Sequence, residues 1–558
     1  MRNAHAVADV RAAEQELMAR LPDGALMQRA AAGLAAVCAD LLDPVYGARV
    51  VVLAGSGDNG GDALYAGARL ARRGAVVTAL TTGSRVHEGA AADLRAAGGR
   101  LILAAGSGPA HTRTPTDTRT PTDTSGLAGS AGPADTGGRL EADGLSAAAA
   151  ELIGGADLVI DGMLGIGGKG GLREPGAALA AAAADGPGLV IAVDLPSGVD
   201  ADTGEVAGAA VRADVTVTFG TWKPGLLIDP AASFAGATEL IDIGLGPSLA
   251  DPAVTALQAA DVAGMLPRPG AESDKYRRGV LGVVAGSTRF TGAATLAVGG
   301  ALRGGAGMIR LVSAAHAAEI ARQHWPEAVI TVVGRDTDPL GGLATAGAVP
   351  AAEAVAAAGQ VQAWVAGPGM GTDDDAAALL ASVLASDLPV LVDADGLTIA
   401  ARERGLLRRD AATLITPHAG ELARLLGTDR DAVEARRLAH ARQAADELGV
   451  TVLLKGSTTM IAGPSGSGPV LVNATGTSWL ATAGSGDVLS GLAGALLAQG
   501  LSPAEAGAAG AYLHGLAGRL AAAGGRRGDS DGAGTGAPIG AADLIHALPR
   551  AIRRTAGS

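Results

Sequence analysis

The 558-residue sequence contains one cysteine, Cys38. A single cysteine cannot form an intrachain disulfide and cannot supply a cysteine metal cluster, so both kinds of stabilised scaffold are excluded. Cys38 lies in the alanine-rich run "MQRAAAGLAAVCADLL". We expect it to fill a small space in a core rather than to act as a nucleophile.

Aromatic side chains are also scarce, because Phe, Trp and Tyr together make up 2% of the chain. Hydrophobic residues nevertheless reach 48%, so Ala, Val, Leu and Ile must fill the cores, and the 86 glycines must largely mark turns. A chain of this length rarely folds around a single hydrophobic core. We therefore expect two or more soluble globular domains.

Positive charge is in deficit, with 43 Lys and Arg against 56 Asp and Glu and a net charge of −13. Nucleic acids and anionic membrane surfaces are bound by clustered Lys and Arg, so we expect neither as a partner. An anionic small molecule stays compatible with this charge, because a pocket of backbone amides can bind an anion locally.

The N-terminal segment "MRNAHAVADVRAAEQELMARL" lacks the apolar central stretch of a secretory signal. Long stretches of low charge, such as residues 354–372, are interrupted by Gly, Pro and Gln, which does not suit a membrane-spanning helix. A cytoplasmic location is the expectation.

What the chain does contain is a regular alternation of short β-branched runs with alanine-rich helical stretches. Runs such as "ARVVVLAG", "ADLVIDGMLG" and "GLVIAVDLPSG" occur in the first half, and "GVLGVVAGS", "PVLVDADG" and "TVLLKGSTTMI" in the second. This alternation predicts parallel sheets with helices on both faces, the α/β class, in both halves.

Two stretches break the alternation. Residues 106–146 contain a repeat of TRTPTDT that is too polar and too rich in proline to pack, and we expect an unstructured surface insertion there. Prolines cluster at residues 244–270, which indicates a domain boundary. We expect a first domain over 1–245, a linker over 246–260 and a second domain over 261–558.

A glycine-rich turn follows the first of these strands. In "LAGSGDNGGDALYAGARL", Gly55, Gly57 and Gly60 have the spacing of a dinucleotide fingerprint, and a helix beginning near Asp62 would point its free N–H groups at a phosphate. The next strand ends in "LTTGSR" without the acidic residue that holds a ribose hydroxyl in dehydrogenases. The dehydrogenase interpretation loses its main support, while a phosphate cradle and a structural turn both stay open.

Polar residues follow several strands of the first half. Asn59 lies in the glycine-rich turn, Asp161 follows "ADLVI", and Asp194 and Ser197 belong to "DLPSGVDADTG". Because the carboxyl ends of parallel strands meet at one edge of a sheet, we expect these side chains to converge. Their oxygen atoms suit a hard cation, and a carboxylate beside it can act as a base. Each aspartate taken alone could equally cap a helix or a turn.

The segments "GSGDNGGDALYAGARL", "DGMLGIGG", "AVDLPSGVDADTG" and "TFGTWKPGLL" together resemble the NAD(P)H-hydrate epimerase family over about residues 5–245. Ala63, where a glycine is common, and the insertion at 106–146 depart from the family pattern. The resemblance implies a potassium ion held by Asn59, Asp161 and Ser197, with Asp194 as the acid/base beside the nicotinamide. It also implies that the hydrated nucleotide is bound by Asp58, Asn59, Gly60, Gly61, Asp62, Gly165, Ile166, Gly167, Gly168, Lys169, Gly170, Gly171 and Asp194.

In the second half, "LATAGSGDVLSGLAGALLAQGL" combines a compact turn at residues 484–486 with Asp487 in the first turn of a helix. The helix amides could neutralise an oxyanion, and a carboxylate beside such a site is what phosphoryl transfer to a hydroxyl requires. A simple helix cap is the alternative for Asp487. In "LVDADGL", Asp393 and Asp395 lie on opposite faces if the strand continues through them.

Two further segments of the second half carry polar groups after a strand. "VLLKGSTTMI" presents Lys455 with the hydroxyls of Ser457, Thr458 and Thr459, which suit nucleotide phosphates, although a lysine at such a position is often solvated. "LITPHAGELARLLG" places His418 between a strand and a helix. A structural histidine is the alternative to a ligand-binding one.

The segments "SDKYRRGVLGVVAGSTRFTGAA", "VAGPGMG", "LVDADGL", "TPHAGEL", "LLKGSTT" and "GSGD" resemble the ribokinase-like, ADP-dependent NAD(P)H-hydrate dehydratases over about residues 260–558. Gly396 departs from the frequent Asp-Ala-Asp-Ala-Leu pattern, away from the phosphate chemistry. The resemblance implies that Asp487 is the catalytic base. It implies a hydrate site of Ala293, Gly371, His418 and Asp487, and a nucleotide site of Lys455, Gly456, Ser457, Thr458, Thr459 and Gly486.

Together the two resemblances imply a Rossmann-like, doubly wound epimerase domain that uses K⁺, followed by a ribokinase-like dehydratase domain that uses ADP with Mg²⁺. The first would interconvert the R and S forms of NADHX and NADPHX, and the second would dehydrate the S form with release of AMP and phosphate. NADHX, NADPHX and ADP are the small-molecule partners that this implies, and we expect a homo-oligomer. The alternative is a ribokinase-like small-molecule kinase fused to a non-catalytic nucleotide-binding module.

Overall fold

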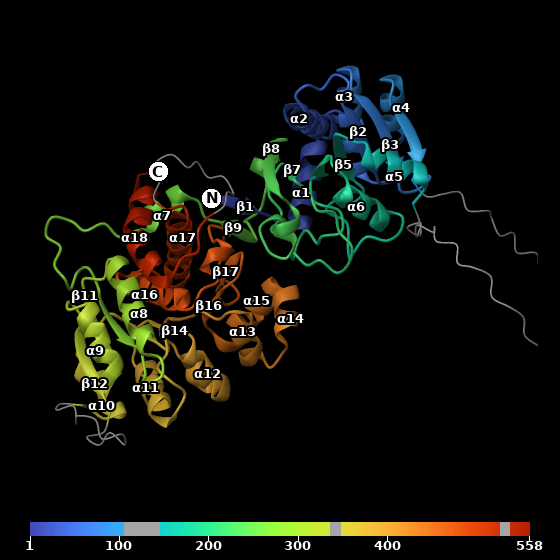
Figure 1. The fold of residues 1–558 in the computed structure, drawn as a ribbon. Helices are drawn as coiled ribbons and strands as arrows, with labels where there is room; N and C mark the ends of the chain where they lie inside the picture. Colours follow the sequence, from blue (N-terminus) through green and yellow to red (C-terminus); the bar gives the residue numbers. More distant parts are fainter. Residues whose placement is uncertain (105–144, 335–347, 525–535, 558) are drawn as a thin grey trace, which may run out of the picture.

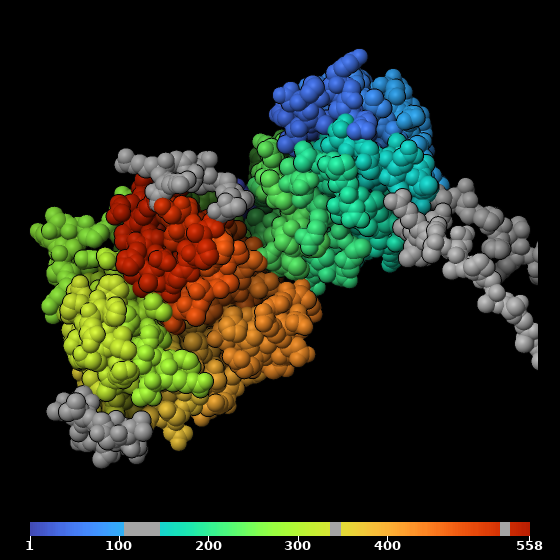
Figure 2. Space-filling model, viewed as in Figure 1, coloured from blue at the N-terminus to red at the C-terminus, as the bar shows by residue number. Residues whose placement is uncertain are grey.

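The computed structural model describes residues 1–104, 145–334, 348–524 and 536–557. Within these residues the strands form two sheets, one in each half of the chain. Figure 1 shows the two halves as separate bodies, the first mostly blue to green and the second mostly light green to red. Figure 2 shows that they meet where the green and orange surfaces adjoin.

The sheet of the first half consists of parallel strands in the order β4-β3-β2-β5-β6-β7-β8. The order reverses between β2 and β5, and at such a point the loops after the two strands leave toward opposite faces and open a crevice. The bounds are β2 (Arg49–Ala54), β3 (Val76–Thr81), β4 (Arg100–Leu103), β5 (Leu158–Gly162), β6 (Leu189–Val193), β7 (Val215–Phe219) and β8 (Ala237–Ile241).

Helices cover both faces of this sheet. Val50 and Val52 of β2 pack toward one group of helices, while Val51 and Leu53 of the same strand pack toward the other. Burial on both faces explains why these strands are continuous apolar runs. The doubly wound α/β fold expected for the first half is confirmed. The first group is α1 (Val7–Met18), α2 (Ala25–Leu42), α3 (Asp58–Arg72) and α4 (Glu88–Ala96), and the second is α5 (Ala147–Gly154) and α6 (Gly176–Asp185).

The second sheet has the order β1-β9-β18-β17-β16-β15-β14-β13-β10-β11-β12. The strands from β16 to β12 in this order are parallel, whereas β17 is antiparallel to both of its neighbours. The bounds are β10 (Val280–Val284), β11 (Met308–Ala314), β12 (Val329–Val333), β13 (Ala363–Ala366), β14 (Val390–Val392), β15 (Thr413–Ile415), β16 (Thr451–Leu454), β17 (Thr459–Ala462) and β18 (Val470–Asn473).

Two hydrophobic clusters lie on opposite faces of the second sheet, so its α/β class is confirmed as well. The two groups of helices that cover these faces are seen in Figure 1. One group is α7 (Ala259–Met265), α8 (Thr291–Arg303), α9 (Ala315–His324), α16 (Ser485–Ala498), α17 (Pro503–Ala522) and α18 (Ala541–Ala556). The other is α10 (Ala351–Ala358), α11 (Asp374–Leu384), α12 (Asp395–Arg402), α13 (Ala419–Leu426), α14 (Arg430–Ala435) and α15 (Arg437–Leu448).

The N-terminus of the chain adds a strand to the sheet of the second half. β1 (Arg2–Ala4) pairs antiparallel with β9 (Val254–Ala256), so that Asn3 lies opposite Thr255. β1 comes from the region expected to form the first domain, and β9 from the expected linker. The domain boundaries themselves stay a prediction. Most of the expected insertion, residues 105–144, lies outside the described residues, and Ser146 at its end caps α5 by accepting the Ala149 N–H.

Cys38 lies on α2 and is completely buried, and burial raises its pKa to about 12. This burial confirms its expected place in a core. A thiol with this pKa is also not available as a nucleophile. Among the described residues, α2 alone has the length and apolar composition that would allow a helix to cross a membrane. This helix packs against α3 and buries residues such as Leu34 in the core of the first half.

Candidate active sites

Asp161 lies at the carboxyl end of β5 and is completely buried. Its Oδ1 atom accepts hydrogen bonds from Ser197 Oγ at 2.7 Å and from the Met163 N–H at 3.2 Å, and its Oδ2 atom accepts the Ser197 N–H at 2.8 Å. Burial raises the pKa of Asp161 to about 6, although these hydrogen bonds lower it. A buried carboxylate of this kind is stabilised by a nearby cation.

Asn59, in the first turn of α3, reaches across to the ends of β5 and β6. Its Nδ2 atom donates to Val193 O at 2.6 Å and to Leu164 O at 3.3 Å. Ser197 Oγ lies 3.3 Å from the same Leu164 O and accepts the Leu164 N–H at 2.8 Å. The structure thus brings Asn59, Asp161 and Ser197 to one point, together with two carbonyl oxygens.

Asp194 follows β6 with a φ of 67°, a left-handed conformation that residues other than glycine rarely adopt. Its Oδ1 atom accepts hydrogen bonds from Thr218 Oγ1 at 2.9 Å, from the Phe219 N–H at 3.2 Å and from Lys223 Nζ. The Lys223 side chain is 1% exposed, and its ammonium also donates to Thr218 Oγ1 and Phe219 O, each at 3.0 Å. Asp194 and Lys223 therefore form a buried ion pair, in which these three bonds all reach Oδ1 of the carboxylate.

Two more carboxyl groups lie near this ion pair. Asp62 is 7% exposed, and its Oδ1 atom has no hydrogen-bond partner among the described residues. Burial and the charges of Asp194, Asp58 and Glu14 raise the pKa of Asp62 well above its ordinary value. Burial also raises the pKa of Glu14, against the effect of Lys223. The site thus combines an ion pair with two carboxyl groups whose pKa values are raised.

Lys223 and Glu14 were not singled out from the sequence. Lys223 lies within "TFGTWKPGLL", and the available signal is a lysine shortly after a strand, which ends at Phe219, in an apolar context. Glu14 comes from α1, and nothing in the sequence indicates that this helix reaches the strand ends. Tertiary packing alone places it there.

The glycines of the first half have packing roles of their own. A Cβ atom on Gly60 would lie 2.2 Å from Gly55 O, and one on Gly165 would lie 2.2 Å from Asn59 Oδ1. α3 begins at Asp58, earlier than the start near Asp62 expected from the sequence, because the turn itself is helical.

In the loop 165–171, an ion pair of 3.1 Å links Lys169 to Asp200, and both the hydrogen bond and the charge of Asp200 raise the pKa of Lys169. Of the expected substrate residues, Gly60, Gly61 and Asp62 are buried, whereas Asp58, Gly167 and Lys169 are exposed.

In the second half, Asp487 lies in the first turn of α16. Burial and the charges of Asp393 and Asp395 raise the pKa of Asp487 to about 7, although Lys455 lowers it. A carboxyl group with this pKa exchanges its proton at neutral pH, as a general base must.

The N-terminus of α16 is fixed from two directions. Gly484 precedes it with a φ of 86°, a conformation that favours glycine. The buried His514 of α17 donates from Nε2 to Ser485 O at 2.9 Å, and burial lowers the pKa of His514 to about 4. His514 is therefore neutral near pH 7. Its role was not visible in the sequence, because it is one histidine in an alanine-rich helix.

Lys455 lies between two carboxylates, with Nζ 2.8 Å from Asp393 Oδ1 and 3.7 Å from Glu421 Oε2. Burial lowers the pKa of Lys455, but the charges of Asp393 and Glu421 outweigh it, and the pKa is raised overall. A Cβ atom on Gly486 would lie 3.7 Å from Lys455 Nζ, so the lysine stands against the N-terminus of α16. Asp393 also accepts a hydrogen bond from Ser490 Oγ at 2.6 Å.

Asp393 and Asp395 do not occupy opposite faces of one strand. β14 ends at Val392 and α12 begins at Asp395, so the condition for that arrangement is not met. Asp395 Oδ2 instead accepts the Gly371 N–H at 3.0 Å. The turn that contains Gly371 also contacts Ala293, since a Cβ atom on Gly369 would lie 2.7 Å from the Ala293 Cβ. Ala293 and Gly371 are therefore linked through this turn, and Gly371 is bonded to Asp395, whose charge acts on Asp487.

His418 is the N-cap residue of α13. Its Nδ1 atom accepts the N–H groups of Gly420 at 3.0 Å and of Glu421 at 3.3 Å. Burial lowers the pKa of His418, although the charge of Glu421 raises it. A structural role is therefore visible, and Nε2 lies 3.6 Å from Glu421 Oε1.

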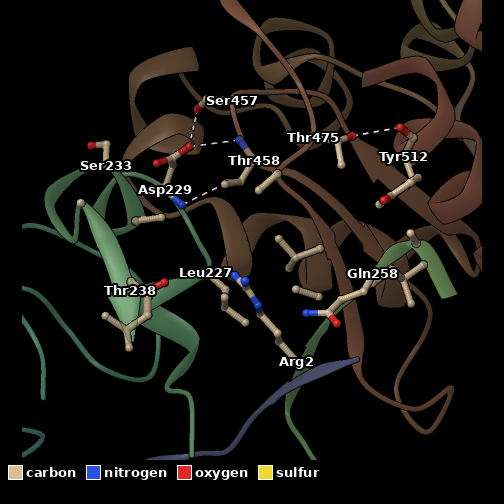
Figure 3. Close-up of a pocket in the computed structure, with 18 of the residues that line it drawn as sticks. Arg2, Leu227, Asp229, Ser233, Thr238, Gln258, Ser457, Thr458, Thr475 and Tyr512 are labelled. Atoms are coloured by element: carbon tan, nitrogen blue, oxygen red, sulfur yellow. Dashed lines mark hydrogen bonds between the residues drawn. The ribbon is translucent and has the colours of Figure 1, made fainter. Parts of the chain in front are cut away.

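The loop 455–459 divides into two groups. Lys455 points to Asp393, as described, and Thr459 Oγ1 donates to Gly456 O at 3.3 Å. Ser457 and Thr458 instead contact Asp229 of the first half, which Figure 3 shows.

Comparison with known proteins confirms the two resemblances. The family model described as NAD(P)H-hydrate dehydratase matches residues 281–530, and the model described as YjeF-related protein N-terminus matches residues 23–225. The chain is 44% identical over 514 residues to the bifunctional NAD(P)H-hydrate repair enzyme Nnr of Mycobacterium tuberculosis, which covers 91% of this chain and 92% of that protein.

A second relative of the same name, from Corynebacterium glutamicum, is 31% identical over 575 residues, which covers 89% of this chain and 88% of that protein. Among solved structures, the ADP/ATP-dependent NAD(P)H-hydrate dehydratase from Bacillus subtilis, co-crystallised with ATP/Mg²⁺, has a TM-score of 0.43 and 26% identity and covers 53% of this chain and 97% of that one. Likeness over nearly the full length of these relatives shows that the chain belongs to the family of bifunctional NAD(P)H-hydrate repair enzymes.

Proposed function

We propose that the first half interconverts the R and S hydrates of NADH and NADPH, and that the second half dehydrates the S hydrate with ADP. The observation that carries the proposal is the carboxyl of Asp487, whose pKa is raised to about 7 beside Lys455 at the start of a helix. The relatives' names and the buried pair of Asp194 and Lys223 support the epimerase half.

For the epimerase, we propose that Asp194 moves protons at the 6-hydroxyl of the substrate. The Asp194 carboxylate, after taking a proton from solvent, delivers it to this hydroxyl, so that the lone pair of ring nitrogen N1 expels water and leaves an iminium at C6. Water then adds to the other face and returns a proton to the carboxylate. Lys223 holds Asp194 in place, and Asp62, whose buried Oδ1 atom has no partner among the described residues, is available to polar groups of the substrate.

The oxygen atoms around Asp161 fit a potassium ion. No group of three or more His, Cys, Asp and Glu side chains in the described part of the chain is arranged to hold a metal. Asn59, Asp161 and Ser197 instead gather one carboxylate, one amide and one hydroxyl beside carbonyl oxygens, which are the hard donors that a monovalent cation takes. We infer that these three residues hold K⁺, which would supply positive charge next to the nucleotide.

Potassium is expected to raise the melting temperature of the protein above the value in NaCl or choline chloride at equal ionic strength. A ligand at ten times its Kd stabilises the folded state by about 1.4 kcal/mol. Thermal melts in the three salts measure this effect, and the same melts on Asp161→Asn and Ser197→Ala should show no preference for potassium. Equal melting temperatures of the wild-type protein in all three salts would contradict the site.

For the dehydratase, we propose that Asp487 takes the proton of the 6-hydroxyl. The oxygen of this hydroxyl attacks the β-phosphorus of ADP, and AMP leaves. The N1 lone pair then expels phosphate from C6, and loss of a proton from C5 restores the dihydronicotinamide. Lys455 and the amides at residues 484–486 stabilise the phosphoryl charge. Mg²⁺ would be bound to the nucleotide phosphates. Asp393 and Asp395 are oxygen donors of the type that Mg²⁺ binds.

Dehydration of pure S hydrate is expected to lose rate on the acidic side with an apparent pKa of about 7, because Asp487 must be ionised to accept a proton. Asp393→Asn should move this limb to lower pH, since the charge of Asp393 raises the pKa of Asp487. The measurement is kcat/KM against pH, by absorbance of the reduced nicotinamide, for both proteins. A flat profile from pH 5 to 8 would exclude Asp487 as the base.

The competing function is a kinase, which would use the same site but release a stable phosphorylated product. Chromatography of authentic hydrate incubated with ADP separates the two outcomes. We expect NADH, AMP and phosphate, and an accumulating phosphorylated hydrate would contradict the dehydratase.

A further inference from the structure

The loop that joins β16 to β17, residues 455–458, is held from within the second half by Arg437. The guanidinium of Arg437 donates to Lys455 O and to Thr458 O, each at 3.1 Å. Arg437 is buried, and a Cβ atom on Gly456 would lie 2.3 Å from its Nη2 atom. The glycine therefore lets the backbone of the loop lie directly on the guanidinium.

Asp229 holds the same loop from the first half. It lies between the short 3₁₀ helices η1 (Pro224–Leu226) and η2 (Ala231–Phe234). Its Oδ2 atom accepts the Thr458 N–H at 3.0 Å and the Ser457 hydroxyl, and its own N–H donates to Thr458 Oγ1 at 3.1 Å. Figure 3 shows these bonds as dashed lines. Thr458 is buried, so without Asp229 its N–H would lose its acceptor.

Charge links Asp229 to Arg437 as well. Burial lowers the pKa of Arg437, and the negative charges of Asp229 and Glu434 oppose this effect. Glu434 belongs to α14, close to Arg437 in the chain, whereas Asp229 comes from the other half. The first half thus supplies part of the counter-charge of a cation buried beneath the loop.

The surface beside this contact is hollow. A pocket of about 520 Å³ lies between the halves, lined by Arg2 and Asp229 from the N-terminal side and by Ser457, Thr475 and Tyr512 from the other (Figure 3). Apolar packing is therefore interrupted next to the loop. The outer side of the loop depends on the hydrogen bonds of Asp229.

We propose that Asp229 of the epimerase half is a positioning residue for the nucleotide loop of the dehydratase half. The inference rests on the proposed function, because it takes residues 455–459 as part of the ADP site. The Ser457 hydroxyl and the Thr458 N–H fix the loop to Asp229, which leaves Lys455 and Gly456 to face the nucleotide. Affinity of the dehydratase for ADP then depends on the half of the chain that carries the other activity.

Asp229→Ala is expected to raise both the Kd and the KM for ADP about 10-fold, the scale of losing hydrogen bonds to a charged acceptor. The kcat with pure S hydrate should stay within about twofold, and epimerisation should not change. Asp229→Asn should recover much of the affinity, because its amide oxygen can still accept the Thr458 N–H. Titration calorimetry with ADP and Mg²⁺ and steady-state kinetics on the full chain measure these values.

Arg436→Gln is the matched control. It removes a different contact between the halves, the ion pair of 3.2 Å with Glu205, without touching the loop, and ADP affinity should not change. Equal ADP affinity of wild type and Asp229→Ala would overturn the proposal. Tighter binding by Asp229→Ala would also overturn it, since the carboxylate would then compete with the nucleotide. A wild-type protein that binds ADP without dehydrating the hydrate would overturn the proposed function, while calorimetry would still decide the role of Asp229.

Discussion

Asp487→Asn is expected to lower ADP-dependent dehydration about 100-fold or more, the loss that follows removal of a general base. The asparagine keeps the size of the side chain and the amides of α16, but it cannot take the proton of the 6-hydroxyl. Epimerisation and most of the ADP affinity should be retained. The measurement is the rate of NADH formation from pure S hydrate, with ADP binding followed by calorimetry.

The alternative role of Asp487 is to stabilise the first turn of α16, and Asp374→Asn is the control for it. Asp374 is an exposed carboxylate in the first turn of α11, in the same half of the chain. Loss of such a charge costs about 0.3–1 kcal/mol of stability. A folded Asp487→Asn that regenerates NADH at nearly the wild-type rate would leave Asp487 with that role alone.

Asp194→Asn is expected to stop interconversion of the R and S hydrates while the S hydrate is still dehydrated in the presence of ADP. Asparagine retains an oxygen acceptor for Lys223, Thr218 and the Phe219 N–H, so the buried cluster keeps most of its hydrogen bonds. From an equal mixture of epimers, NADH formation should stall near the S fraction, apart from slow spontaneous epimerisation. Progress curves from mixed and from pure S substrate on the same variant measure this.

Asp214→Asn provides the comparison for a structural aspartate of the same sheet. Asp214 accepts the Val190 N–H at 2.8 Å, between the starts of β6 and β7, far along the strands from Asp194. It should cost some stability and leave epimerisation intact. If a folded Asp194→Asn converts the whole mixture at the wild-type rate, the proposed acid/base role has to be abandoned.

The gathering of polar groups in the first half could be predicted because one topological rule decides it. Asn59, Asp161, Asp194 and Ser197 each lie at or after the end of a strand, and parallel strands end at one edge of the sheet. In the structure Asn59 and Ser197 both reach Leu164 O, and Ser197 also donates to Asp161. Asp194 lies at the same sheet edge, but its partner is Lys223. The pattern predicts proximity, and the pairing follows from packing.

Most of the groups that the sequence did not reveal come from elements whose position depends on tertiary packing. Glu14 lies on α1, His514 on α17 and Asp229 in a loop, and none follows a strand of the sheet on which it acts. Hydrophobic periodicity places a helix against a sheet but does not show which strand end it approaches. Asp393 and Asp395 show the same limit locally, because the end of β14 was not visible in an apolar run.

Conversion of an equal mixture of R and S NADHX by the wild-type protein, followed by absorbance of the reduced nicotinamide with and without ADP, tests the two-step repair most directly. With ADP and Mg²⁺ in excess, the account predicts that the whole mixture becomes NADH, with one AMP and one phosphate per NADH. Without ADP, the epimers should exchange and no NADH should form. A plateau at the S fraction with ADP, or a phosphorylated hydrate in place of NADH, would contradict the account.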